Sequence, residues 1–191
     1  MDPFQAVEVF AAVTGVLYVA LEILQKNGMW AVGILTGAAC ACSFAVQHVW
    51  ASAGLNLYYV AMSVVGLVQW KKAGAQVAEG ELHLAALSRR TAALSALLLV
   101  VGAPILIGLL RAAGDPLPAL DGVATMLSVI ATWWLAQSYL QQWLLWVVAD
   151  LMSTTLCLLS GQYWMAGLYL AYAVAAVYGY LHWKKRGKVV N

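Results

Sequence analysis

The stretch NLYYVAMSVVGLVQWKK at Asn56–Lys72 returns in altered form as YLAYAVAAVYGYLHWKK at Tyr169–Lys185. The identical positions are Leu57/Leu170, Tyr59/Tyr172, Val64/Val177, Gly66/Gly179, Trp70/Trp183, Lys71/Lys184 and Lys72/Lys185. A tryptophan followed by basic residues is a common ending of a membrane span, so the last three matches carry little weight. The other four indicate that a membrane helix has been duplicated within the chain. A weaker similarity pairs Trp30-Ala-Val with Trp146-Val-Val.

The composition around this repeat is that of a membrane protein. Of 191 residues, 64% are hydrophobic and 9% are charged, whereas soluble domains carry roughly 25% charged residues. A span needs about 20 apolar residues, so seven spans nearly use up the chain and leave no room for a separate soluble domain. The predicted spans are Phe4–Leu24, Met29–Val46, Leu55–Trp70, Thr91–Leu110, Leu120–Ala136, Trp143–Leu159 and Trp164–Trp183.

The basic residues predict the orientation of these spans. With seven spans, Arg111 falls on one side of the membrane, and all other Lys and Arg residues fall on the opposite side: Lys26, Lys71, Lys72, Arg89, Arg90, Lys184, Lys185, Arg186 and Lys188. Positive charge in short loops marks the cytoplasm. The amino terminus is therefore expected outside and the carboxyl terminus in the cytoplasm, with residues 71–90 forming a solvated cytoplasmic linker.

The repeat and the spans together predict an all-α integral membrane fold with a 3+1+3 parallel repeat. The expected parts are a three-helix repeat at 1–70, a loop and linker helix at 71–119, a second repeat at 120–183 and a basic tail at 184–191. In transporters built from parallel repeats, the substrate site lies between the repeats near mid-membrane. The alternative is that the duplication only provides a stable helix bundle.

Asp150 is the strongest candidate for a substrate-binding residue. It lies seven residues after Trp143 in the sixth span, about 10 Å along the helix, and an ionisable group at membrane depth is costly. Trp143, Trp146 and Asp150 share one helix face because they are spaced i, i+3 and i+7. A carboxylate flanked by indoles suits a flat cationic ligand. The alternative is a carboxyl group that is protonated or hydrogen-bonded for packing alone.

Two polar stripes accompany Asp150. Asn56, Tyr59 and Ser63 share one face of the third span, and Tyr169 and Tyr172 occupy the equivalent face of the seventh. Facing stripes of this kind are expected to line an aromatic passage for substrate. Tryptophans near span ends are more often interfacial anchors, and this interpretation is preferred for Trp50, Trp70, Trp164 and Trp183.

Tyr18 and Glu22 are one turn apart in the first span and are further candidates for substrate contact. Because Glu22 is close to Lys26, an interfacial ion pair is an equally good interpretation. Gly33 and Gly37 form a GxxxG pattern that favours close helix approach.

Other chemistries find no support in the sequence. HExxH, GxSxG and phosphate-binding glycine loops are absent. Span-end or loop positions predict solvated side chains for His48, His83 and His182, and Cys40, Cys42 and Cys157 are expected to be core residues. We therefore predict no catalytic residue, no metal, no cofactor, no nucleic-acid partner and no enzymatic activity.

Several stretches resemble the PnuC family of bacterial vitamin transporters. They are Gln137–Asp150 continuing to Gly161-Gln-Tyr163, Leu55-Asn-Leu-Tyr-Tyr59 leading to Gly66–Trp70, and the ending Gly179–Trp183. The resemblance implies a SWEET-like 3+1+3 fold, often trimeric, that works as a uniporter in the bacterial inner membrane. It also implies import of an unphosphorylated vitamin that a cytoplasmic kinase then traps. Nicotinamide riboside is the substrate of the best-known members, and thiamine is that of the PnuT branch.

Two positions depart from the nicotinamide riboside pattern. Asp150 stands where those members carry Asn, and Asn56 stands where they carry Gln. The substitutions favour thiamine as substrate, with nicotinamide riboside as the alternative. Hypotheses of another class are an intramembrane enzyme that uses Asp150 and Glu22 as acid and base, and a structural or sensory membrane subunit.

Overall fold

The computed structural model describes residues 3–46, 50–74 and 81–189. The predictions for His48 and for the side chain of Trp50 lie outside the described residues. The helices are α1 (Pro3–Ile23), α2 (Gly28–Val46), α3 (Trp50–Gly74), α4 (Arg89–Ala112), α5 (Pro118–Ala136), α6 (Gln142–Leu159) and α7 (Tyr163–Arg186); two short strands are β1 (Leu82–Leu84) and β2 (Gly187–Val189). Each predicted span coincides with one helix, and α3 extends further than predicted at both ends.

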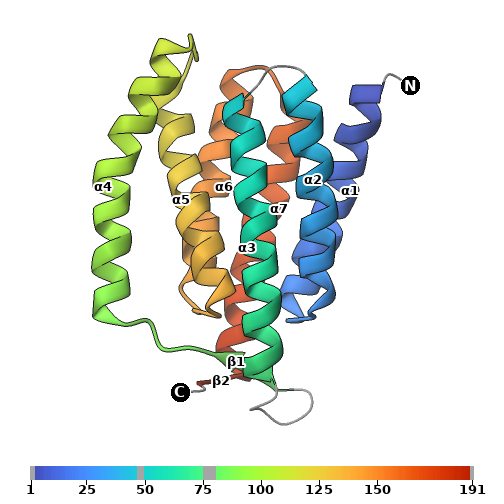
Figure 1. Cartoon of the computed structure of the whole chain (residues 1–191), viewed down its shortest axis with the longest axis vertical. Coiled ribbons are helices and arrows are strands. Elements are labelled where there is room, and N and C mark those ends of the chain that lie inside the picture. Colours follow the sequence, from blue (N-terminus) through green and yellow to red (C-terminus); the bar gives the residue numbers. More distant parts are fainter. Residues whose placement is uncertain (1–2, 47–49, 75–80, 190–191) are drawn as a thin grey trace. The chain divides into compact units, whose positions relative to one another are not determined.

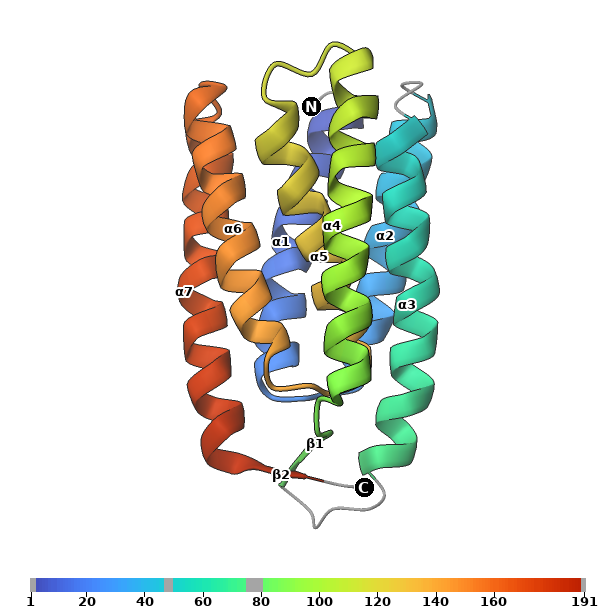
Figure 2. The same ribbon diagram turned by 90° about the vertical axis from the view of Figure 1, so that its left-hand side faces the viewer.

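The chain forms two compact units, Met1–His83 and Leu84–Val189. In unit 1, α2 packs against both α1 and α3 (Figure 1). In unit 2, α5 packs against α4 and α6, and α6 packs against α7 (Figure 2). The fourth helix thus belongs to the same compact unit as the second three-helix group.

Five helices are long and apolar enough to cross a membrane: α4 to α7 over their whole length, and α3 over Ala53–Gly74. The apolar segments Val9–Ile23 of α1 and Gly28–Ser43 of α2 are shorter. The described part of the chain is therefore that of a multi-pass membrane protein, and the count of seven spans stays a prediction.

The internal repeat is visible in how each unit packs. In unit 1, a Cβ on Gly66 would clash with the Trp30 ring, and the rings of Trp30 and Trp70 meet edge to face at 5.0 Å. In unit 2, a Cβ on Gly179 would lie 2.6 Å from the Trp143 ring, which meets Trp183 at 5.4 Å. The counterpart of Trp30 is therefore Trp143, and the sequence pairing with Trp146 is wrong. The pairing with Trp146 depended on two apolar residues beside each tryptophan, which are too few to fix the register of the repeat.

The turns before α2 and α6 repeat as well. Gln25 and Ser138 both have a positive φ, of 50° and 60°, which is uncommon for residues other than glycine. The following N–H of Lys26 donates to the carbonyl of Leu21, and that of Tyr139 donates to the carbonyl of Trp134. Helices α1 and α5 thus both end in the left-handed cap that closes many helices.

The predicted solvated linker is wrong at its centre. Leu82, His83 and Leu84 are all buried, each less than 8% exposed. The two leucines beside the histidine favour burial. The main chain of His83 can be buried because the side chain of Gln25 satisfies its hydrogen bonds: Gln25 Nε2 donates to the carbonyl of His83, and Gln25 Oε1 accepts from its N–H, both at 2.8 Å. The prediction of a solvated His83 is wrong for the same reason.

The prediction of interfacial anchors is also wrong for Trp70 and Trp183, which are 1% and 0% exposed. Trp70 packs on Trp30 beside Gly66, and Trp183 packs on Trp143 beside Gly179, so both indoles lie inside their own units. Trp164, by contrast, is largely exposed, as an anchor in the membrane interface should be.

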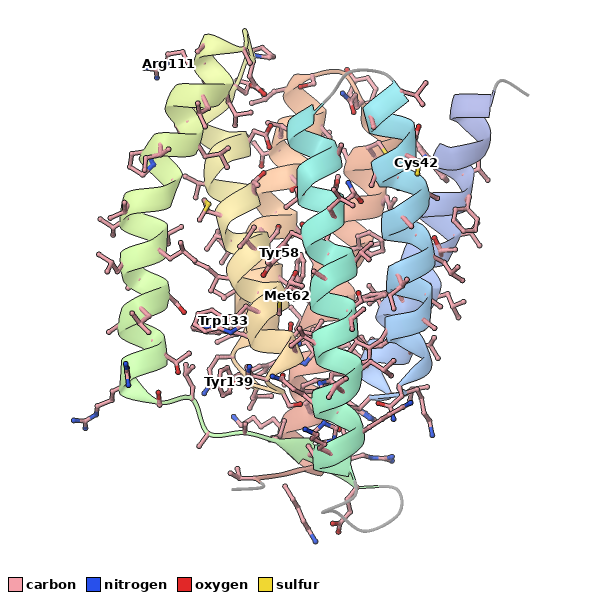
Figure 3. All side chains as sticks on the ribbon, in the orientation of Figure 1. Cys42, Tyr58, Met62, Arg111, Trp133 and Tyr139 are labelled. Carbon is pink, nitrogen blue, oxygen red and sulfur yellow. The ribbon has the colours of Figure 1, made fainter. Side chains whose placement is uncertain are left out.

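The charged ends of the helices agree with the predicted sidedness inside each unit. In unit 2, Arg111 lies at the opposite end from Tyr139 of the α5–α6 turn (Figure 3), while the basic carboxyl end of α7 lies at the same end as that turn (Figure 1). In unit 1, the basic end of α3 lies at the same end as the α1–α2 turn. Which end faces the cytoplasm stays a prediction.

Candidate functional site

Asp150 is buried in α6, with 7% of its surface exposed. Its counterpart in the repeat, Gly37 of α2, approaches α3, because a Cβ there would meet Val60 and the carbonyl of Asn56. The matching position of α6 therefore directs Asp150 toward α7. Among the described residues, no side chain donates a hydrogen bond to its carboxylate. A buried carboxyl group is costly, and the contact of Asp150 with a ligand stays a prediction.

The aromatic residues around Asp150 come from α6 and α7. Asp150 acts electrostatically on the hydroxyl groups of Tyr169 and Tyr172, whose rings meet edge to face at 6.3 Å. Trp146 lies one helical turn before Asp150, and its buried indole N–H has no hydrogen-bond partner among the described residues. The predicted group of Asp150, Trp146, Tyr169 and Tyr172 is thus brought together within unit 2.

Trp143 has a different environment from its predicted partners. Its side chain is 1% exposed and fills the space over Gly179 against Trp183. Packing between α6 and α7 accounts for this position, and contact with a ligand stays a prediction for Trp143.

Unit 1 holds a second polar cluster at the α1–α2–α3 contact. Glu22 and Ser63 are 3% and 4% exposed. The hydroxyl of Tyr18 has Glu22 and Tyr59 as electrostatic neighbours, and a Cβ on Gly33 would meet both Ser63 Oγ and the Tyr18 ring. Four predicted site residues, Tyr18, Glu22, Tyr59 and Ser63, therefore converge. Glu22 is buried, and its interfacial ion pair with Lys26 stays a prediction.

The predicted glycine face has a clear role here. Gly33 and Gly37 lie where α2 closely approaches α3: a Cβ on Gly33 would meet Ser63, and one on Gly37 would meet Val60 and the carbonyl of Asn56. Asn56 is thus positioned by its backbone in this contact, and its contact with a ligand stays a prediction.

Sequence reasoning missed Asp121 on α5. Its Oδ1 accepts a hydrogen bond from Thr125 at 3.2 Å, and its charge acts on Tyr169. An acidic residue two positions into a predicted span was a signal that could have been used. The two hydrogen bonds between the Gln25 side chain and the main chain of His83, called the clasp below, had no such signal in the sequence, because the two residues are 58 positions apart.

The described residues contain no group of three His, Cys, Asp or Glu side chains that could hold a metal ion. Aromatic rings beside a buried carboxylate instead suit an organic cation, which the carboxylate attracts by charge and the rings by their electron-rich faces. The fold is that of a multi-pass membrane protein, and these clusters are of a kind that suits a small organic solute.

Comparison with known proteins identifies the family. The family model described as "Nicotinamide mononucleotide transporter" matches residues 5–185. The chain belongs to this family, which includes PnuC, as the resemblance predicted.

The relatives match over most of the chain and are themselves longer than it. The nicotinamide riboside transporter PnuC of Neisseria mucosa is 29% identical, over 92% of this chain and 70% of its own, and that of Haemophilus influenzae is 27% identical, over 95% and 80%. A riboflavin/roseoflavin transporter, RibM of Streptomyces davaonensis, is 24% identical, over 92% and 83%. The crystal structure of the vitamin B3 transporter PnuC superimposes with a TM-score of 0.75 at 28% identity, covering 96% of this chain and 83% of that one.

Proposed function

We propose that this protein is a uniporter that imports nicotinamide riboside, which a cytoplasmic kinase then traps by phosphorylation. The single observation that carries the proposal is the buried carboxylate of Asp150 beside Tyr169 and Tyr172. Nicotinamide riboside contains a pyridinium ring, which is flat and positively charged. Desolvation of a carboxylate is costly unless a counter-charge arrives, so the site is built to accept a cation.

The relatives support this substrate over thiamine, which the sequence favoured. The curated relatives from Neisseria mucosa and Haemophilus influenzae are both named nicotinamide riboside transporters. Asp in place of the Asn typical of those members does not exclude the riboside, because a carboxylate is a stronger partner for a pyridinium than an amide is.

Thiamine remains the second candidate. Its thiazolium ring is also a cationic aromatic ring, so Asp150 suits it equally. The relative named as a riboflavin transporter supports variation of substrate within the family, but the neutral riboflavin ring gives no reason for a buried carboxylate.

The proposed architecture is seven spans in a 3+1+3 parallel repeat, with the amino terminus outside the inner membrane. The Trp30–Gly66–Trp70 and Trp143–Gly179–Trp183 contacts support two equivalent three-helix groups, and α4 supplies the odd helix that makes them parallel. A trimeric assembly is proposed on family resemblance alone.

The deciding experiment is uptake into proteoliposomes of purified protein with labelled nicotinamide riboside, thiamine and riboflavin in parallel. We expect equilibration of nicotinamide riboside without ATP and without an ion gradient. Uptake of thiamine alone would replace the riboside as substrate. Accumulation driven by a proton or sodium gradient would contradict the uniporter, and no uptake of any of the three would favour a structural subunit.

A further inference from the structure

The segment Leu82–His83, at the end of unit 1, is held by specific contacts within that unit. The turn residue Gln25 makes two hydrogen bonds to the main chain of His83, as a neighbouring strand would. The His83 ring meets the ring of Trp70 edge to face at 5.5 Å. One side chain from the α1–α2 turn and one from the end of α3 therefore hold the same residue.

This docking point is in contact with the polar cluster of unit 1 through a series of rings. Trp70 meets Trp30 at 5.0 Å, and Trp30 meets Tyr18 at 6.5 Å, both edge to face. Tyr18 in turn has Glu22 and Tyr59 as neighbours. A movement of α1 relative to α3 at the cluster must therefore displace the surface on which His83 rests.

The docked state also contains a cost that undocking would remove. The buried Nε2 of His83 has no hydrogen-bond partner among the described residues. A buried nitrogen of this kind loses its hydrogen bond to water and gains nothing in return. Within unit 1, His83 is held by two hydrogen bonds to the side chain of Gln25 and by the ring contact with Trp70. Contacts of this number can break in a local opening of the structure.

We propose that Leu82–His83 is a latch that keeps the ends of α1 and α3 together within unit 1 and must undock for each transport cycle. The latch rests on the proposed function only in that transport is one of its readouts. Gln25 is a positioning residue, since it acts on the main chain of His83. Weakening the clasp lowers the barrier to undocking and so speeds transport when undocking limits the rate.

The first test is hydrogen exchange of the His83 amide in the full chain in lipid nanodiscs. Gln25→Ala removes both clasp hydrogen bonds and should raise the exchange rate at His83 about tenfold. Gln25→Glu keeps the acceptor but loses the donor, so it should give a smaller rise. The matched control is Gln162→Ala, the same change at an exposed helix start whose side chain makes no capping hydrogen bond; exchange at His83 should stay as in the wild type.

The second test compares uptake by the same proteins in proteoliposomes. Gln25→Ala should raise the initial rate about two- to fivefold over wild type and over Gln162→Ala. Unchanged or lowered uptake would overturn the latch, and so would unchanged exchange at His83. If Gln25→Ala does not fold, Gln25→Glu decides by the same two measurements. The ratio of the initial uptake rates of variant and wild type can be measured with whichever vitamin the wild type carries. Failure of the wild type to take up nicotinamide riboside would therefore contradict the proposed function but leave the test of the latch intact.

Discussion

Replacing Asp150 by Asn separates charge pairing from packing at the proposed site. The side chain keeps its size, and no hydrogen bond to the carboxylate is lost among the described residues. A carboxylate and a ring cation about 5 Å apart attract by about 3 kcal/mol at an effective dielectric constant of 20. Because the amide retains a dipole and both charges must be desolvated, we expect a net loss of about 1–3 kcal/mol, or about 5- to 150-fold in Kd.

The assay is calorimetric binding of nicotinamide riboside and of its 1,4-dihydro form, whose ring is nearly the same size but neutral. Asp150→Asn should weaken binding of the cation by the stated factor and that of the neutral form by much less. The melting temperature should stay the same or rise, because a costly buried carboxyl group is removed. Equal losses for the two ligands would refute the assignment of Asp150 as the cation site. A lower melting temperature with unchanged affinities would show that the carboxyl group serves packing.

Three further predictions test the fold and the latch. Gly66→Ala and Gly179→Ala place a methyl group against the Trp30 and Trp143 rings. Each should lower the free energy of unfolding by about 1–3 kcal/mol in a thermal unfolding measurement. The control Gly54→Ala, with open space around it, should be neutral or stabilising. Burial lowers the pKa of His83 from 6.5 to about 4, so the docked segment favours the neutral ring. Docking should therefore weaken as the pH falls from 6.5 toward 4. Protection of the amide at position 83 from hydrogen exchange, corrected for intrinsic exchange, should fall over this range in the wild type and stay level in His83→Phe. A green fluorescent protein fused to the carboxyl terminus should fluoresce and an alkaline phosphatase fused there should be inactive, and the reverse result would contradict both the orientation and the count of seven spans.

The helices were predictable because membrane spans are long apolar runs bounded by charges and turn residues. Every predicted span matches one helix, and Gly33 and Gly37 were correctly placed at a close helix contact. The buried tryptophans were not predictable, because a Trp beside two lysines looks the same whether it faces lipid or packs on a glycine. Only the structure shows that Trp70 and Trp183 turn inward.

The residues of the candidate site were predicted from the sequence, but which of them lie close together was not. Helical spacing placed Asp150 and Trp146 on one face, but it could not show that the carboxylate lies beside Tyr169 and Tyr172 of another helix. The latch was missed for a related reason. A short segment flanked by charges has the composition of a solvated loop, and its burial depends on Gln25, a residue distant in sequence.

The repeat itself separates structural residues from functional ones. The positions that hold each unit together occur twice: Trp30 with Trp143, Gly66 with Gly179, Trp70 with Trp183, and the positive-φ residues Gln25 with Ser138. The buried carboxyl groups do not follow this rule. Asp150 corresponds to Gly37 of unit 1, and Glu22 corresponds to Leu135 of unit 2, although both pairs stand at equivalent points of the same packing scheme. Since Gly37 and Leu135 serve these points without any charge, the fold does not require a carboxyl group at either one. We therefore propose that the carboxyl groups of Asp150 and Glu22 serve what the protein binds rather than how it folds.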